Sequence, residues 1–260
     1  MRRLLVVLAL LAAALPLGVA ALWIALPDPS TLATTNPKTT ALIEQRRSEA
    51  RAAHKSFRPM RVWVPLERIS PRLVQAVLLS EDARFYAHGA FDWREVQAAA
   101  EESFEAGRAL RGASTVTQQL AKNVWLGTER TFSRKAKEAV LAVKLERALS
   151  KRRVLTLYLN VAEWGEGVFG AEAAARTWFG KPAADLTTAE AALLAAMLPA
   201  PRRAHLDPPP RWLARRARHA LDLLREARRI DDLEHARAAA DLARLLGGAS
   251  GPEEAPDDAQ

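Results

Sequence analysis

The stretch from Ser70 to Phe85 constrains the fold most, because it predicts a helix whose apolar stripe contains a carboxylate. Ser70 before Pro71 is a typical N-cap followed by proline at the first helical position. At 100° per residue, Glu81 shares a face with four apolar residues: Val74, Val77, Leu78 and Phe85. A carboxyl group buried there has a raised pKa and can exchange a proton near neutral pH. The alternative is an ordinary glutamate at the solvated tip of the helix.

A second helix, predicted from Ser133 onward, also carries a carboxylate on its apolar face. Glu138 lies on the same face as Leu141, Ala142, Leu145 and Leu149. Two helices that each bury a glutamate provide the paired carboxylates that sugar-transfer chemistry uses. The segment between them, Gly112 to Asn123, is dense in hydroxyl and amide side chains that suit hydrogen bonding to a sugar or a phosphate. The alternative for this segment is the capped start of a helix.

Composition excludes some kinds of site and favours an anionic partner. The chain has 260 residues, room for one sizeable domain plus appendages, and no cysteine, so disulfide bonds and thiolate sites are excluded. The net charge of +8 is uneven, since residues 130–153 contain nine basic and two acidic side chains. Nucleic acid, anionic lipid head groups and a pyrophosphate-bearing substrate are the candidate partners for this basic segment.

The N-terminus predicts a membrane anchor. Arg2 and Arg3 precede an uncharged, mainly apolar run from Leu4 to Leu26, and a bilayer-spanning helix needs about 20 such residues. The two arginines favour a cytoplasmic N-terminus, with everything after Pro27 outside the plasma (inner) membrane. A cleaved signal peptide with a weak processing site at residues 18–20 is the competing interpretation. An exported domain meets little nucleic acid, so we expect no nucleic-acid partner.

Long helical periodicities and few strand candidates predict a mainly α fold. Further helices are expected at 41–54, 93–110, 151–161, 171–178 and 189–198, with a helical pair at 211–246 and an extended stretch at 57–65. The predicted organisation is an anchor (1–27), a linker with a polar helix (28–56), the main domain (57–210), C-terminal helices (211–246) and a disordered acidic tail (247–260).

Four ordered blocks resemble those of a known family. They are Glu-Asp-x-x-Phe-x-x-His from Glu81, Gly-x-Ser-Thr-Val-Thr-Gln-Gln-Leu-x-Lys-Asn from Gly112, Arg-Lys-x-x-Glu from Arg134, and Lys-x-x-Val-Leu-x-x-Tyr-Leu-Asn from Lys151. In this order they look like the signature blocks of the peptidoglycan glycosyltransferases, glycosyltransferase family 51, and specifically its monofunctional biosynthetic transglycosylases. One departure is Ala90, where the family commonly has glycine.

The resemblance implies a lysozyme-like, two-lobed domain that polymerises lipid II into glycan strands and releases undecaprenyl pyrophosphate. It makes Glu81 the general base and places Glu138 at the leaving group, with a divalent cation (Mg²⁺ or Mn²⁺) or a positioned water and no organic cofactor. Asp82 and His88 are expected to shape the first loop. The implied substrate-binding residues are Ser114, Thr115, Gln118, Gln119, Lys122, Asn123, Arg130, Arg134, Lys135 and Lys137.

The same resemblance makes Trp125 and Leu126 candidates for a membrane-resting surface, although an aromatic pair is more often core. The membrane, the growing glycan strand and other cell-wall synthesis and division proteins are the expected partners. Two rival functions stay open: a glycan-cleaving muramidase or lytic transglycosylase with Glu81 as general acid, and a non-enzymatic, membrane-anchored cell-wall scaffold.

Overall fold

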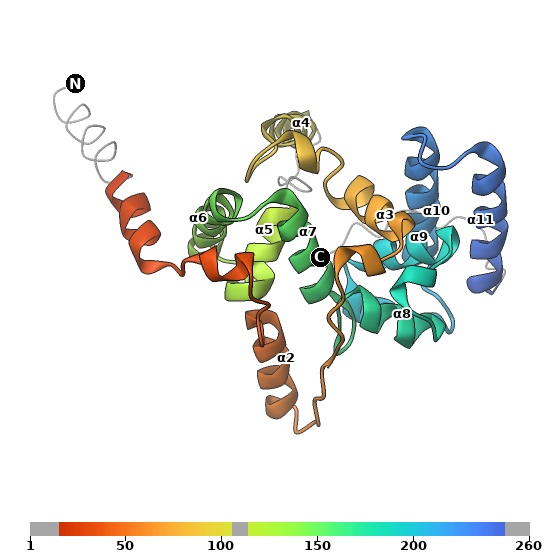
Figure 1. Cartoon of the computed structure of the whole chain (residues 1–260), viewed down its shortest axis with the longest axis horizontal. Helices are drawn as coiled ribbons and strands as arrows, with labels where there is room; N and C mark the ends of the chain where they lie inside the picture. Colours follow the sequence, from red (N-terminus) through yellow and green to blue (C-terminus); the bar gives the residue numbers. More distant parts are fainter. Residues whose placement is uncertain (1–15, 106–113, 248–260) are drawn as a thin grey trace.

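A computed structural model describes residues 16–105 and 114–247, and these residues are mainly helical, as predicted (Figure 1). Residues 16–25 are helical. The longer helices that follow are α2 (Ala41–Ala52), α3 (Pro71–Glu81), α4 (Trp93–Glu105), α5 (Val116–Ala121), α6 (Phe132–Ala148), α7 (Lys151–Val161), α8 (Ala171–Phe179), α9 (Thr188–Met197), α10 (Arg211–Glu226) and α11 (Asp232–Leu245). Short turns include the 3₁₀ helix η1 (Pro29–Ala33) and the π-helical η4 (Lys122–Leu126).

Two groups of helices meet at the candidate active site described below. On one side α3 packs against α9 and α10, and on the other α5 packs against α6 and α7 (Figure 1). The C-terminal helix α10 contributes Leu213, Leu221 and Leu224 to the same hydrophobic core as these elements. Helix α11 covers α10 and α9. The predicted C-terminal helical pair therefore exists and packs against the folded domain.

Helix starts follow the capping residues in the sequence. Thr187 and Glu190 form a reciprocal capping box at the start of α9. Ser150 caps α7 by accepting a hydrogen bond from the backbone N–H of Arg153. Ser70 is the N-cap of α3 by position, but its hydroxyl donates to the Leu186 carbonyl at 3.2 Å instead of capping the helix.

The strand content is small. The extended stretch at 57–65 forms a strand only at Met60–Arg61 (β1), which pairs in parallel with β3 (Val168–Phe169), and β3 pairs antiparallel with β2 (Glu163–Gly165). The chain leaves this hairpin at Gly170, with a φ of 87°. A Cβ atom there would lie 2.8 Å from the Asn160 carbonyl oxygen, so both the backbone conformation and the space require glycine.

The segment from Asn123 to Phe132 begins within the π-helical turn η4. Trp125 and Leu126 are partly buried and pack against the core, which is the alternative expected for an aromatic pair. The exposed aromatic side chains among the described residues are Tyr86, Trp93, Phe104 and Phe132.

Some predictions fall partly outside the described residues. The apolar run from Leu4 to Leu26 begins in residues 1–15, the expected end of the helix at 93–110 lies in residues 106–113, and the tail lies in residues 248–260. Within 16–105 and 114–247, no helix has the length and apolar character needed to cross a bilayer.

Candidate active site

Glu81 is the last residue of α3 and is partly buried. The Nε2 atom of Gln119 in α5 donates a hydrogen bond to its Oε2 atom at 2.8 Å. Burial raises the pKa of Glu81 above its usual 4.5, and the charge of Asp82 raises it further, while the bond from Gln119 and the charges of Arg216 and Lys122 oppose the shift. Glu81 is therefore a stronger base than an exposed glutamate.

The orientation of Gln119 is set by Tyr158 in α7. The Tyr158 hydroxyl donates to Gln119 Oε1 at 2.8 Å, so the amide nitrogen of Gln119 must face Glu81. Burial raises the pKa of Tyr158 well above 10, and the charge of Glu81 adds to this effect. Tyr158 consequently stays protonated and holds the amide in one orientation. The sequence places Tyr158 in the fourth block but gives it no role at the site, because only the fold brings it near Glu81.

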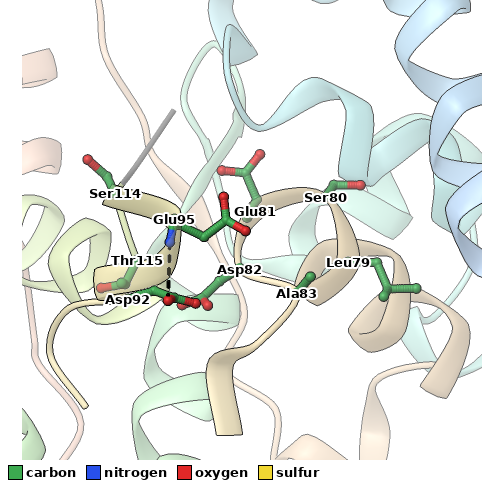
Figure 2. Close-up of a pocket in the computed structure, with 9 residues that line it drawn as sticks. All are labelled: Leu79, Ser80, Glu81, Asp82, Ala83, Asp92, Glu95, Ser114 and Thr115. Carbon is green, nitrogen blue, oxygen red and sulfur yellow. Dashed lines mark hydrogen bonds between the residues drawn. The ribbon is translucent and has the colours of Figure 1, made fainter. Parts of the chain in front are cut away.

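Glu81 opens onto a pocket of about 150 Å³ (Figure 2). Side chains from the end of α3, the start of α4 and the segment before α5 surround it: Leu79, Ser80, Glu81, Asp82, Ala83, Asp92, Glu95, Ser114 and Thr115. Carboxylates and hydroxyls dominate this lining, and both groups can accept hydrogen bonds from a sugar. The sequence had predicted Glu81, Ser114 and Thr115 for the site, whereas Asp92 and Glu95 were missed.

Asp82 and His88 organise the loop after α3. One carboxylate oxygen of Asp82 accepts the backbone N–H of Val116 at 2.9 Å, and the other lies 2.6 Å from His88 Nε2. These bonds fix the end of α3 against the start of α5, which is the loop-shaping role expected for the two residues. Thr115 and Gln118, predicted to bind substrate, form a reciprocal capping box at the start of α5.

Glu138 is 3% exposed and lies one turn inside α6. Arg134 and Lys135, on the preceding turn, each form an ion pair with one of its carboxylate oxygens. Lys135 Nζ also donates to Ser114 Oγ at 3.1 Å, which connects this group to the pocket beside Glu81. The structure thus brings four predicted site residues together: Ser114, Arg134, Lys135 and Glu138.

The charges of Glu81 and Glu138 both act on Lys122. Burial lowers its pKa below 10.5, and the charges of Arg134 and Lys135 lower it further, while Glu138 and Glu81 act in the opposite direction. Within the described residues its ammonium group makes no hydrogen bond or ion pair with another side chain. This cation is available to an anionic group bound between the two glutamates.

The other predicted binding residues lie around Lys122 in the sequence. Asn123 is buried in η4, Lys137 is half-buried in α6, and Arg130 is exposed just before α6. Arg216 of α10 was missed; its position in an amphipathic helix far along the chain gave no signal of an effect on Glu81.

The residues around Glu138 do not fit a protein-held metal site. Both of its oxygens are already paired with cations. Among residues 16–105 and 114–247, no three His, Cys, Asp or Glu side chains are grouped closely enough to hold a metal ion. Arg134 and Lys135 supply the positive charge next to Glu138.

A glutamate with a raised pKa next to a pocket of hydroxyls and carboxylates, with a second glutamate paired to cations, is an arrangement typical of enzymes that act on sugars. Residues 48–225 match the protein family described as Transglycosylase. The chain belongs to this family.

Curated relatives agree with this assignment. The chain is 54% identical over 157 residues to the biosynthetic peptidoglycan transglycosylase of Rhodospirillum centenum, covering 60% of this chain and 68% of that protein. It is 47% identical over 167 residues to the protein of the same name from Laribacter hongkongensis, covering 64% and 73%. Among solved structures, Penicillin-Binding Protein 1A from Haemophilus influenzae is 20% identical with a TM-score of 0.42, covering 70% of this chain and 17% of that one.

Proposed function

We propose that this chain is a peptidoglycan glycosyltransferase that polymerises lipid II into glycan strands and releases undecaprenyl pyrophosphate. The observation that carries the proposal is the placement of two different groups in one site. Burial raises the pKa of Glu81, and Lys122 and the Arg134–Lys135–Glu138 group supply positive charge. Family membership and the names of the relatives support the same activity.

In the proposed reaction, Glu81 is the general base. A hydroxyl of the acceptor sugar gives its proton to Glu81 as its oxygen attacks the anomeric carbon of the growing chain. The bond from that carbon to the pyrophosphate oxygen breaks, and its electron pair leaves with the pyrophosphate, so the configuration inverts. Gln119 holds Oε2 of Glu81 by a hydrogen bond, which orients the carboxylate for this transfer.

The leaving group needs positive charge, and the basic side chains near Glu138 supply it. Lys122 interacts electrostatically with both glutamates, and Arg134 and Lys135 are held in place by Glu138. Glu138 then acts by positioning these cations, so that they neutralise charge developing on the pyrophosphate. Arg130 and Lys137 extend the same positive surface.

We further propose that the domain is two-lobed and lies outside the inner membrane, anchored by the apolar run from Leu4 to Leu26. The length of this run and the preceding Arg2 and Arg3 support the anchor and its orientation. An anchored domain acts at the membrane surface, where a lipid-linked substrate resides. Other cell-wall synthesis and division proteins are the proposed protein partners.

The test is to incubate the detergent-solubilised full chain with labelled lipid II and to separate the products on a gel, with Glu81→Gln as the comparison. A ladder of long glycan from the native chain alone supports the proposal. Soluble fragments from preformed glycan would point to a lytic enzyme. A folded, lipid II-binding chain that makes no polymer would favour a scaffold.

A further inference from the structure

The end of the N-terminal helix is attached to α6. Lys144 Nζ donates hydrogen bonds to the carbonyl oxygens of Trp23 at 2.9 Å and Leu26 at 2.6 Å. The same ammonium lies 5.4 Å from the centre of the Trp23 ring, and Arg147 lies 5.5 Å from it. A cation at the carboxyl end of a helix stabilises it, so this contact fixes where the helix meets the domain.

A second pocket lies next to this contact. Its volume is about 520 Å³, and Arg147 lines it together with Arg84 and Arg94. Phe91 and Trp93 form part of the wall, and Trp93 is 70% exposed. The pocket therefore combines guanidinium groups with aromatic surface, as sites at a membrane interface do.

The acidic side chains in the lining are already engaged. Asp92 Oδ1 accepts hydrogen bonds from the backbone N–H groups of Arg94 and Glu95, whereas Oδ2 accepts no hydrogen bond from the described residues and lies 3.6 Å from Arg84 Nε. Glu146 pairs with Lys151 at 2.8 Å. Arg94 and Arg147 form no ion pair within the described part of the chain. The pocket thus presents unneutralised positive charge.

This pocket is distinct from the one beside Glu81, since the two share only Asp92 in their linings. It lies against the second half of α6, through Val143, Glu146 and Arg147, whereas Glu138 and its cations occupy the first half. A ligand there would contact Arg147, which also packs on the Trp23 ring of the N-terminal helix, and not the proposed reacting groups.

We infer that this pocket binds the phosphate-bearing headgroup of an anionic phospholipid next to the anchor. The inference rests on the membrane anchoring in the proposed function. The guanidinium groups of Arg94 and Arg147 take the phosphate, and Trp93 and Phe91 contact the glycerol and the first methylenes of the chains. Because α6 also carries Glu138, a bound lipid fixes the angle at which the active site faces the bilayer.

The test is native mass spectrometry of the full chain in detergent, titrated with dioleoyl phosphatidylglycerol or dioleoyl phosphatidylcholine. The chain should prefer phosphatidylglycerol, and Arg94→Gln with Arg147→Gln should weaken that binding about 25-fold, roughly 5-fold per arginine. Arg152→Gln with Arg203→Gln removes two exposed arginines elsewhere and should leave it unchanged.

Equal phosphatidylglycerol binding by the native chain and the Arg94/Arg147 variant would overturn the inference, as would an equal loss in the control. If inorganic phosphate competes as well as the lipid does, the pocket is a simple anion site and not a lipid site. Loss of lipid II binding alone would assign the pocket to the substrate. Polymerisation in detergent is measured in parallel and should not change in the variant, so a chain that binds phosphatidylglycerol without polymerising would refute the proposed function alone.

Discussion

Glu81 and Glu138 are the same residue type on the apolar faces of two helices, yet their surroundings differ. Glu138 is buried between two cations, Arg134 and Lys135. Glu81 has a neutral amide as its hydrogen-bond partner, and the cations that influence it act from a distance. A carboxylate in two ion pairs holds its cations in place, whereas burial beside a neutral amide raises the pKa of Glu81 and suits it to accept a proton. The neighbours therefore assign different roles to the two glutamates.

The surroundings of Glu81 also affect the stability of the fold. The folded-state pKa of Glu81 is raised above the ordinary value of 4.5, so its contribution is fully present below that value and is lost as the pH rises through the folded pKa. At neutral pH the ionised Glu81 therefore destabilises the fold. Strain of this kind is typical of functional groups.

The largest expected effect is that of Glu81→Gln, which should lower polymerisation about 10³-fold because glutamine cannot accept the proton. The variant should still bind lipid II. Its melting temperature at neutral pH should be equal to or above that of the native chain, since a destabilising charge is removed. Gel separation of labelled products, lipid II binding and thermal melts measure the three quantities. Polymerisation above a trace would refute the assignment of Glu81 as the base.

The second prediction concerns Glu138→Gln, which should lower polymerisation about 10²-fold by releasing Arg134 and Lys135 from their positions. Here the free energy of unfolding should fall by about 1–2 kcal/mol, discounted because Lys135 is 46% exposed. Urea unfolding measures this loss. An increase in stability, as expected for Glu81→Gln, would erase the contrast between the two glutamates.

Glu172→Gln is the matched control for this variant. Glu172 is also buried and forms an ion pair with Arg176, but it lies in α8 outside the site. It should lose stability as Glu138→Gln does while keeping polymerisation. If it loses both, the effect of Glu138→Gln on activity has to be attributed to folding.

Periodicity and capping residues were sufficient to predict the two glutamate-bearing helices. Glu81 and Glu138 were identified because a charge interrupts an apolar stripe, and this signal is local in sequence. The structure agrees at both of these positions.

Contacts between distant segments could not be predicted in this way. Tyr158 and Gln119 are 39 residues apart, and Arg216 acts on Glu81 from another helix, so no local pattern connects them. The π-helical turn at Trp125 was also not predicted, because backbone hydrogen bonding and packing determine it and the side-chain pattern does not.

The third prediction concerns the basic side chains outside the ion pairs. Arg130→Ala with Lys137→Ala should weaken lipid II binding about 10-fold at low salt, and less at high salt, because screening already reduces the attraction. Titration at two salt concentrations measures this. Arg152→Ala with Arg203→Ala is the charge-matched control. Unchanged affinity in the Arg130/Lys137 variant would mean that these residues face bilayer lipid instead of substrate.

The smallest expected effect concerns Gln119. It tests whether the hydrogen bond from Gln119, in addition to burial, sets the pKa of Glu81. The rate constant kcat/KM should rise with pH as Glu81 ionises, and the hydrogen bond from Gln119 lowers the pKa of Glu81 against the effect of burial. Gln119→Ala removes this bond, so the rise of kcat/KM with pH (the rising limb of the pH profile) should move to higher pH. Tyr158→Phe should move it in the same direction by less, because the amide stays present but loses its fixed orientation.

A pH profile of polymerisation tests this, with Gln97→Ala on α4 as a control whose profile should match that of the native chain. The activity lost by Gln119→Ala should be greatest at low pH and recover as the pH rises, because a weaker acid still ionises fully once the pH exceeds its pKa. A loss that is uniform across the pH range would contradict this, since a group that only contacts the substrate changes the rate without moving the limb. Gln119 would then be a binding residue, and burial alone would account for the raised pKa of Glu81.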